Sequence, residues 1–269
     1  MHKRKKLWAS ISAITFASAT GLVGCDTTVE QNDSLASVQV SQSAVAISSD
    51  GEGEGASALA LDMTTSDITY LTQLSLIRGH LYVGHQLYMA GYLDHAKTHM
   101  KHPKSELYAD IIPAFEARST SGFGQELQNL ATAVNDDLGS KEVDAAYQKL
   151  LDKITISETA VESMSQTPKE KLKLVAALLQ VAGEEYAIAV VNGKMENAHE
   201  YQDALGFTTI ARSIISQLDA NTDSHQHAAT LVDSIKPLWP TLIPPSTLDT
   251  DAGEIYGVAA KVELLALSL

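Results

Sequence analysis

The chain has 269 residues, of which 45% are hydrophobic, and carries a formal net charge of −14, with 33 acidic residues against 19 Lys and Arg. A surface of this charge repels nucleic acids and anionic lipid headgroups, which excludes DNA and RNA as partners and favours cationic ones. Cys25 is the single cysteine. It lies far toward the N-terminus, so the folded part can contain neither a disulfide framework nor a thiolate metal site.

The first 25 residues have the organisation of a bacterial secretion signal. A basic leader at residues 2–6 precedes an uncharged run at 7–24, which is too short and too rich in small residues for a membrane span. The sequence Leu22-Val23-Gly24-Cys25 resembles the signal of bacterial lipoproteins, which places an aliphatic residue three positions before a lipid-modified cysteine. An ordinary signal peptide with a chance cysteine is the alternative.

The lipoprotein resemblance implies a location. Residues 1–24 would be removed, a lipid on Cys25 would anchor the chain to a membrane of the cell envelope, and the protein would face the periplasm. Asp26 follows the cysteine, and in enteric-type lipoproteins an aspartate there is associated with retention at the inner membrane. Removal of the leader also makes the net charge four units more negative, because residues 3–6 are all basic.

Residues 25–63 predict a flexible linker, since they include the run Gly51-Glu52-Gly53-Glu54-Gly55 and show no sustained apolar period. From residue 64 the pattern is helical almost throughout and predicts an all-α antiparallel helical bundle over 64–269, with either one core or two halves, 64–138 and 139–269. Helices are predicted from Ser66 to a stop at Gly91, over 92–102 up to Pro103, from 105 through 115, and over 124–138, 140–153, 168–191, 198–218, 224–236 and 251–267. No segment of this part shows strand alternation bounded by hairpin turns, and the alternative within the linker is an edge strand over Val38–Ile47.

Five histidines cluster between residues 80 and 102, and they are the main chemical signal: His80, His85, His95, His99 and His102. On a helix His95, His99 and His102 fall within an arc of about 60°. Neutral imidazoles at this spacing can bind Fe, Cu or Zn, so we expect two of these three, with a group from a neighbouring helix, to hold a transition metal ion. His80 and His85 lie about 140° apart, so at most one of them can join. The alternatives are a solvated polar face and a proton-linked or interaction role.

A second candidate cluster lies in two later helices and comprises Glu185, His199, Glu200 and Asp203. Antiparallel packing across the short turn at Gly193 would bring these residues to a similar depth. Carboxylates and imidazoles from facing helices are how helical bundles build iron and manganese sites. The alternative is that the carboxylates form salt links around a buried pair of tyrosines.

The residues around this cluster carry a family resemblance. Glu185-Tyr186, Gly193-Lys194-Met195, Glu200-Tyr201-Gln202-Asp203 and Phe207 resemble a helical pair in the extracytoplasmic region of bacterial high-affinity iron permeases, a region similar to the imelysin-like iron-uptake lipoproteins. The resemblance implies iron handling beside an inner-membrane metal permease. The imelysin-like motif of His followed three residues later by Glu is not reproduced, because Gln202 and His102 stand at that distance from His199 and His99.

Motifs of common catalysts are missing: there is no Gly-x-Ser-x-Gly, phosphate-binding glycine loop, His-Glu-x-x-His or Cys-x-x-Cys-His. We therefore expect a protein that is not an enzyme. The leading hypothesis is a periplasm-facing lipoprotein that binds or buffers a transition metal in iron or copper handling. The competing hypothesis is a structural or adaptor lipoprotein that holds another envelope protein without using a metal.

Overall fold

The computed structural model describes residues 62–269 of the chain; the predicted signal peptide (1–24), the lipidation site at Cys25 and nearly all of the predicted linker (25–63) lie outside the described residues. The described part is all-α, as predicted, apart from one short β-ribbon. Its α-helices are α1 (Asp67–Met89), α2 (Leu93–His102), α3 (Tyr108–Ala117), α4 (Gly124–Asn135), α5 (Ser140–Glu158), α6 (Pro168–Ala189), α7 (Ala198–Ile215), α8 (Asp223–Ser234) and α9 (Ala252–Leu267).

Local capping explains where the long helices begin and end. The Ser66 side chain accepts a hydrogen bond from the Thr69 backbone N–H at the start of α1, and Thr167 does the same for Glu170 before α6. Such caps satisfy backbone donors that have no partner within the helix. After α1 the chain turns at Gly91, whose φ of 84° favours glycine.

The region after α2 differs from the sequence-based expectation. Pro103 does not stop the helical path but begins a π-helical turn, Pro103–Leu107, and α3 then starts at Tyr108 rather than at residue 105. Proline lacks a backbone N–H and cannot bond to the carbonyl four residues earlier, so the α-helical hydrogen-bond pattern is interrupted here. The proline therefore changes the helix type while the chain continues to coil.

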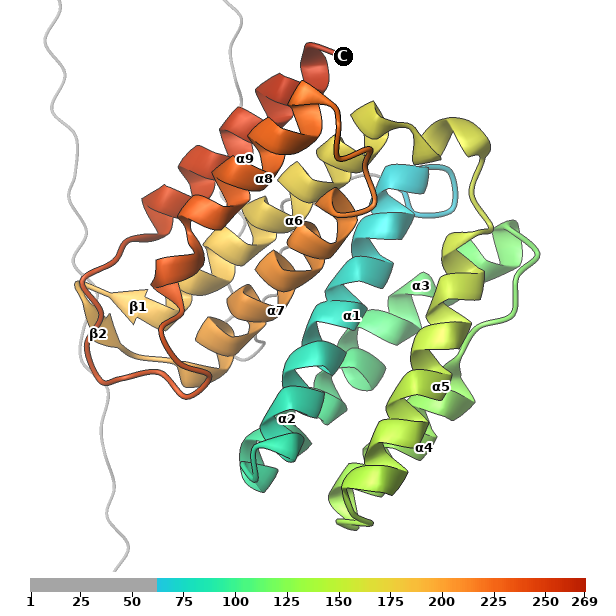
Figure 1. Ribbon diagram of the computed structural model, residues 1–269. Coiled ribbons are helices and arrows are strands. Elements are labelled where there is room, and N and C mark those ends of the chain that lie inside the picture. The colour runs from blue at the N-terminus through green and yellow to red at the C-terminus, as the bar shows by residue number, and fades with distance from the viewer. Residues whose placement is uncertain (1–61) are drawn as a thin grey trace, which may run out of the picture. The chain divides into compact units, whose positions relative to one another are not determined.

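Contacts between neighbouring helices connect the described bundle into one unit (Figure 1). Helix α7 packs against both α6 and α1, α6 also packs against α9, and α1 also packs against α2 and α5. Buried apolar side chains from Tyr70 to Ala266 form one continuous core. Within the described residues, no helix combines the length and apolar character needed to cross a membrane.

Two glycines let α1 and α7 approach backbone to backbone. A Cβ atom placed on Gly206 would lie 2.5 Å from the carbonyl oxygen of Gly79, and one placed on Gly79 would lie 2.5 Å from the Phe207 ring. Any larger residue would separate the helices at this crossing. The crossing lies one residue from His80 and three residues from Asp203, and so it sets the distance between those two side chains.

Candidate metal centre

A tight β-turn positions the start of α7. Strands β1 (Val190–Val191) and β2 (Lys194–Met195) form an antiparallel ribbon, which the sequence did not predict. It closes through Asn192 and Gly193, whose φ angles of 53° and 74° suit a two-residue hairpin turn. Asn197 then caps α7 by accepting a hydrogen bond from the His199 backbone N–H at 3.0 Å. As a result, the acidic and imidazole groups of the second predicted cluster occupy the first two turns of α7.

A third glycine brings α2 against α1. A Cβ atom on Gly84 would lie 2.5 Å from Met100 Cε and 3.1 Å from His99 Cβ. Without a side chain at residue 84, α2 can pack closely enough for His99 to be completely buried. His99 is therefore an exception to the alternative in which the polar residues of α2 form a solvated face.

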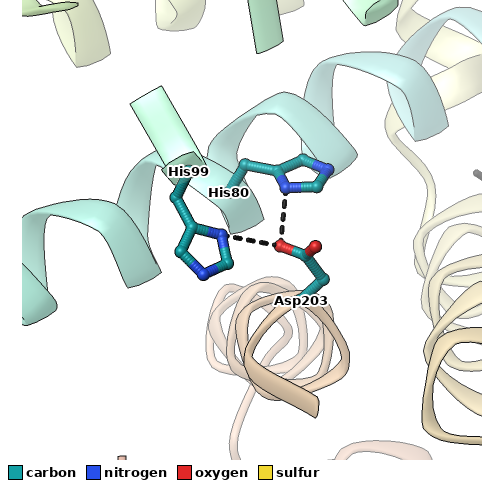
Figure 2. Close-up of side chains that lie close together, drawn as sticks. All are labelled: His80, His99 and Asp203. Atoms are coloured by element: carbon teal, nitrogen blue, oxygen red, sulfur yellow. Dashed lines mark ion pairs between the residues drawn. The ribbon is translucent and has the colours of Figure 1, made fainter. Parts of the chain in front are cut away.

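The carboxylate of Asp203 is the centre of the candidate site (Figure 2). Its Oδ1 atom lies 2.6 Å from His80 Nδ1 and 3.0 Å from His99 Nδ1. Its Oδ2 atom lies 3.1 Å from His199 Nδ1. The side chains of His80 and His99 are 0% exposed and that of Asp203 is 2% exposed. Three imidazoles from three different helices thus meet one buried carboxylate.

Aromatic contacts hold the three imidazole rings in place. His99 and His199 stack with ring centroids 4.0 Å apart and an interplanar angle of 15°. The rings of His80 and Phe207 pack edge to face, with an interplanar angle of 84° and centroids 5.0 Å apart. Packing of this kind restricts ring rotation before any ligand binds, which is the preorganisation that a metal site requires.

A hydrogen-bonded chain determines which nitrogen of His99 carries the proton. The Gln202 amide Nε2 donates to the Leu242 carbonyl oxygen at 3.1 Å, because a carbonyl can only accept. Gln202 Oε1 therefore points at His99 Nε2, 2.9 Å away, and accepts a hydrogen bond from it. In the neutral imidazole this leaves Nδ1 without a proton and with its lone pair toward Asp203.

The contact between His99 Nδ1 and Asp203 Oδ1 consequently joins two acceptor atoms when His99 is neutral. His99 Nδ1 and Asp203 Oδ1 are buried and 3.0 Å apart, yet neither makes a hydrogen bond of ordinary geometry. Two acceptor atoms at this distance repel each other unless a proton or a metal ion lies with them. The amide that orients the far nitrogen is the kind of outer contact that fixes metal-ligating histidines. The donor set fits a metal ion.

The pKa values of these groups favour the forms that bind metals. Burial alone would raise the pKa of the Asp203 carboxyl, but the attraction of His80 and His99 and the contacts from His199 and His80 hold it well below its usual range. Burial lowers the pKa of the His99 imidazole, and the nearby Asp203 carboxylate only partly opposes this. At neutral pH the site therefore offers a carboxylate and a neutral imidazole.

In the part of the chain that the structure describes, two groups have the spacing of metal ligands, and they share Asp203. The first is His80, His99 and Asp203, and the second is His199, Glu200 and Asp203. In the second group Glu200 Oε2 lies 4.0 Å from His199 Nδ1, while Glu200 Oε1 accepts a hydrogen bond from Asn197 Nδ2 at 3.2 Å. The sequence treated the two clusters as alternatives, whereas the structure draws residues from both into one place.

The other predicted site residues lie elsewhere or outside the groups. His85 Nε2 is 3.1 Å from Asp144 Oδ1 of α5, and its ring stacks on Tyr147. His95 is partly exposed on α2, and Glu185 is buried on α6; neither belongs to a group with metal-ligand spacing. His102 ends α2, and its side chain lies outside the description.

Sequence reasoning did not assign a role to Gln202 or Phe207, which orient His99 and His80. Both are fully buried on α7. The available signal was that Gln202 precedes Asp203 in a helix that otherwise packs aromatic and aliphatic residues. A buried amide needs polar partners, so such a glutamine indicates polar groups nearby.

One comparison with known proteins bears on this helical region. Residues 161–266 match the family model of the iron permease-associated 4-helix bundle domain. This range contains α6 to α9 and so includes Glu185, His199, Glu200 and Asp203, while His80 and His99 lie before it. The match supports the resemblance to the helical region of iron permeases. No curated protein and no solved structure matches the chain.

Proposed function

We propose that this protein binds a transition metal ion, with ferrous iron as its cargo, and serves as a non-catalytic accessory in iron handling. The observation that carries the proposal is the buried pair His99 Nδ1 and Asp203 Oδ1, held 3.0 Å apart and both acceptors when His99 is neutral. A cation between them would remove the repulsion and satisfy both atoms.

The donor set supports iron among the candidate metals. His80, His99 and Asp203 together provide two imidazole nitrogens and one carboxylate, which is the ligand combination of many non-haem Fe(II) sites. Zinc and copper accept the same donors, so the geometry leaves them as competitors. The match of residues 161–266 to an iron permease-associated domain favours iron over both.

We further propose that the protein works at the cell envelope beside an inner-membrane metal permease. The lipoprotein-like signal ending at Cys25 supports a lipid anchor, and Asp26 supports the inner membrane with the helical bundle facing the periplasm. A Cys25→Ser variant should lose membrane association on fractionation of cells, and an Asp26→Ser variant should move to the outer membrane. Membrane association that persists in Cys25→Ser would contradict a lipid anchor.

The metal-binding proposal is tested by thermal melts of the demetallated protein with and without Fe²⁺ under anaerobic conditions. A ligand that binds only the folded state stabilises it, by about 2.7 kcal/mol at a hundred times its Kd. We expect Fe²⁺ to raise the Tm of the wild type and to leave that of Asp203→Asn unchanged, because the shared carboxylate is lost. His99→Ala should weaken binding by more than about a hundredfold, since outer contacts of metal ligands alone account for 10–100-fold.

His95→Ala is the matched control, because it removes an imidazole from the same short helix but outside both ligand groups. Its Fe²⁺-induced rise in Tm should equal that of the wild type. A rise that survives in Asp203→Asn, or one that disappears only in His95→Ala, would show that the metal binds elsewhere. Parallel melts with Zn²⁺ and Cu²⁺ rank the three metals.

A further inference from the structure

The two oxygens of Asp203 face different surroundings. Oδ1 meets the Nδ1 atoms of His80 and His99, whose side chains are 0% exposed. Oδ2 meets Nδ1 of His199, whose side chain is 13% exposed, and the neighbouring Glu200 side chain is 6% exposed. One carboxylate therefore joins an inner group with almost no exposed surface to an outer group that lies nearer the surface, although both ring nitrogens of His199 are themselves buried.

The charges around Asp203 match one divalent ion better than two. The ligand groups contain two carboxylates, Asp203 and Glu200, and the remaining donors are imidazoles. One divalent ion balances these two negative charges, whereas two ions would leave two positive charges uncompensated among buried side chains. Uncompensated charge in such surroundings costs several kcal/mol per ion. The inner and outer groups are thus better suited to alternate occupancy than to simultaneous filling.

We propose that the two groups are successive positions for a single ion, a handover that rests on the metal binding proposed above. The ion binds first at the outer position, formed by His199, Glu200 and Oδ2 of Asp203. It then exchanges His199 and Glu200 for His80 and His99 while Asp203 changes from Oδ2 to Oδ1 coordination. Release follows the same steps in reverse, and Asp203 stays bound to the ion throughout.

The stacking of His99 on His199 supports a short transfer. The two rings are nearly parallel with centroids 4.0 Å apart, so a ligand ring of the outer position lies against a ligand ring of the inner position. Both rings already contact the same carboxylate, one at each oxygen. An ion can therefore exchange ligands one at a time without helix movement, which keeps the barrier low because no intermediate loses all of its donors.

Stopped-flow binding of Fe²⁺ to the full-length protein under anaerobic conditions tests the handover, with quenching of tryptophan fluorescence as the signal. Trp239 is a suitable reporter because its indole N–H donates to the Tyr201 carbonyl oxygen on α7. The informative variant is His199→Phe, which keeps a ring to stack on His99 but removes both ring nitrogens. Glu200→Gln is a second outer variant, and His95→Ala is the control.

We expect one equivalent of Fe²⁺ per wild-type chain. In His199→Phe and Glu200→Gln, association and dissociation should both slow by about tenfold, which corresponds to a barrier about 1.4 kcal/mol higher, while Kd stays nearly constant. A residue that only lowers the barrier to transfer changes the association and dissociation rates by the same factor, so Kd is unaffected. In His80→Gln the inner position is lost, so binding should become weaker and both rates should remain fast. His95→Ala should behave as the wild type.

Three results would overturn the handover while leaving metal binding intact. Two equivalents in the wild type would mean that both positions fill together. A faster dissociation and a higher Kd in His199→Phe, equal to those of His99→Ala, would make His199 an ordinary ligand of one site. Unchanged rates in both outer variants would place the route elsewhere. If the wild type binds no Fe²⁺, the proposed function itself fails.

Discussion

Helix α1 carries two histidines that each meet a carboxylate, and the two contacts differ in how buried the carboxylate is and in how many imidazoles it meets. His80 contacts Asp203 of α7, where the side chains are 0% and 2% exposed and a second imidazole reaches the same oxygen. His85 contacts Asp144 of α5, whose side chain is 52% exposed. The His85 ring stacks on Tyr147 with centroids 4.1 Å apart and an interplanar angle of 11°.

Both contacts pair a histidine with an aspartate, so residue type does not separate a candidate site from a structural contact. What separates them is the burial of the carboxylate and the number of imidazoles that meet it. Water can hydrate Asp144 whether or not His85 is present, so that pair stabilises the fold only slightly. Asp203 has no such access to water, and three imidazoles must share it. A buried carboxylate of this kind needs positive charge nearby, which a proton or a metal ion can provide.

The largest effect on stability is expected from disrupting the crossing of α1 and α7. This crossing holds the buried His80–Asp203 contact in place but not the exposed His85–Asp144 contact. In Gly206→Ala the new Cβ would lie 2.5 Å from the Gly79 carbonyl oxygen, which is backbone and cannot rotate away. We expect a loss of about 1–3 kcal/mol in the free energy of unfolding, measured by urea denaturation. Because α1 must move away from α7, His80 leaves Asp203, and the Fe²⁺-induced rise in Tm should shrink as well.

Gly257→Ala is the matched control for this substitution. A Cβ at Gly257 meets nothing within 4 Å, and the residue lies in α9, away from the site. Alanine in a helix interior is favoured over glycine, so stability should rise by up to about 1 kcal/mol with Fe²⁺ binding unchanged. Equal stability of Gly206→Ala and the wild type would show that α1 and α7 tolerate a wider separation.

The next effect is on the pH dependence of stability in the absence of metal. Burial lowers the pKa of both His99 and His85 below the ordinary value of 6.5, with a nearby carboxylate opposing the shift in each case. As the pH falls below 6.5 the unfolded chain takes up protons that the folded chain does not, so the free energy of unfolding decreases. Each histidine contributes up to about 1.4 kcal/mol per pH unit until the pH reaches its folded pKa.

Urea denaturation with a chelator present, at pH 7.5, 6.5 and 5.5, measures this slope. His99→Gln should flatten the slope, because an amide in the same place binds no proton. Asp203 does not contribute in this range, since its lowered pKa affects stability only below its ordinary value of 3.8. The same slope in His99→Gln and the wild type would mean that His99 has the same pKa in the folded and unfolded states.

Local chemistry in the sequence predicts most of the helices. Ser66 and Thr167 are recognisable caps, Gly91 is a recognisable stop, and the apolar period between them is helical, so α1 and α6 follow from residues close in the chain. The π-helical turn at Pro103 does not follow, because a proline reads as a stop unless the turn that it begins is known.

The site is less predictable because its members are distant in the chain. Sequence reasoning grouped His95, His99 and His102 since they share a face of one helix, but His99 meets residues more than a hundred positions away. Periodicity identifies the face of a helix and not the helix that packs against it. The α1–α7 contact depends on Gly79 and Gly206, and two glycines spaced this far apart carry no signal of their pairing.

The smallest effect is expected at the exposed contact of the comparison. Asp144→Asn removes the negative charge beside His85 but keeps the size of the side chain and leaves the ring stacked on Tyr147. Pairs with an exposed partner contribute about 0–1 kcal/mol, so the free energy of unfolding should fall by no more than that, and Fe²⁺ binding should not change. The Asp144 carboxylate opposes the lowering of the His85 pKa, so NMR titration should give a lower His85 pKa in the variant. A loss of several kcal/mol, or a weaker response to Fe²⁺, would mean that the contact between α1 and α5 also holds the buried site in place, and the two histidine–carboxylate contacts would then act as one unit.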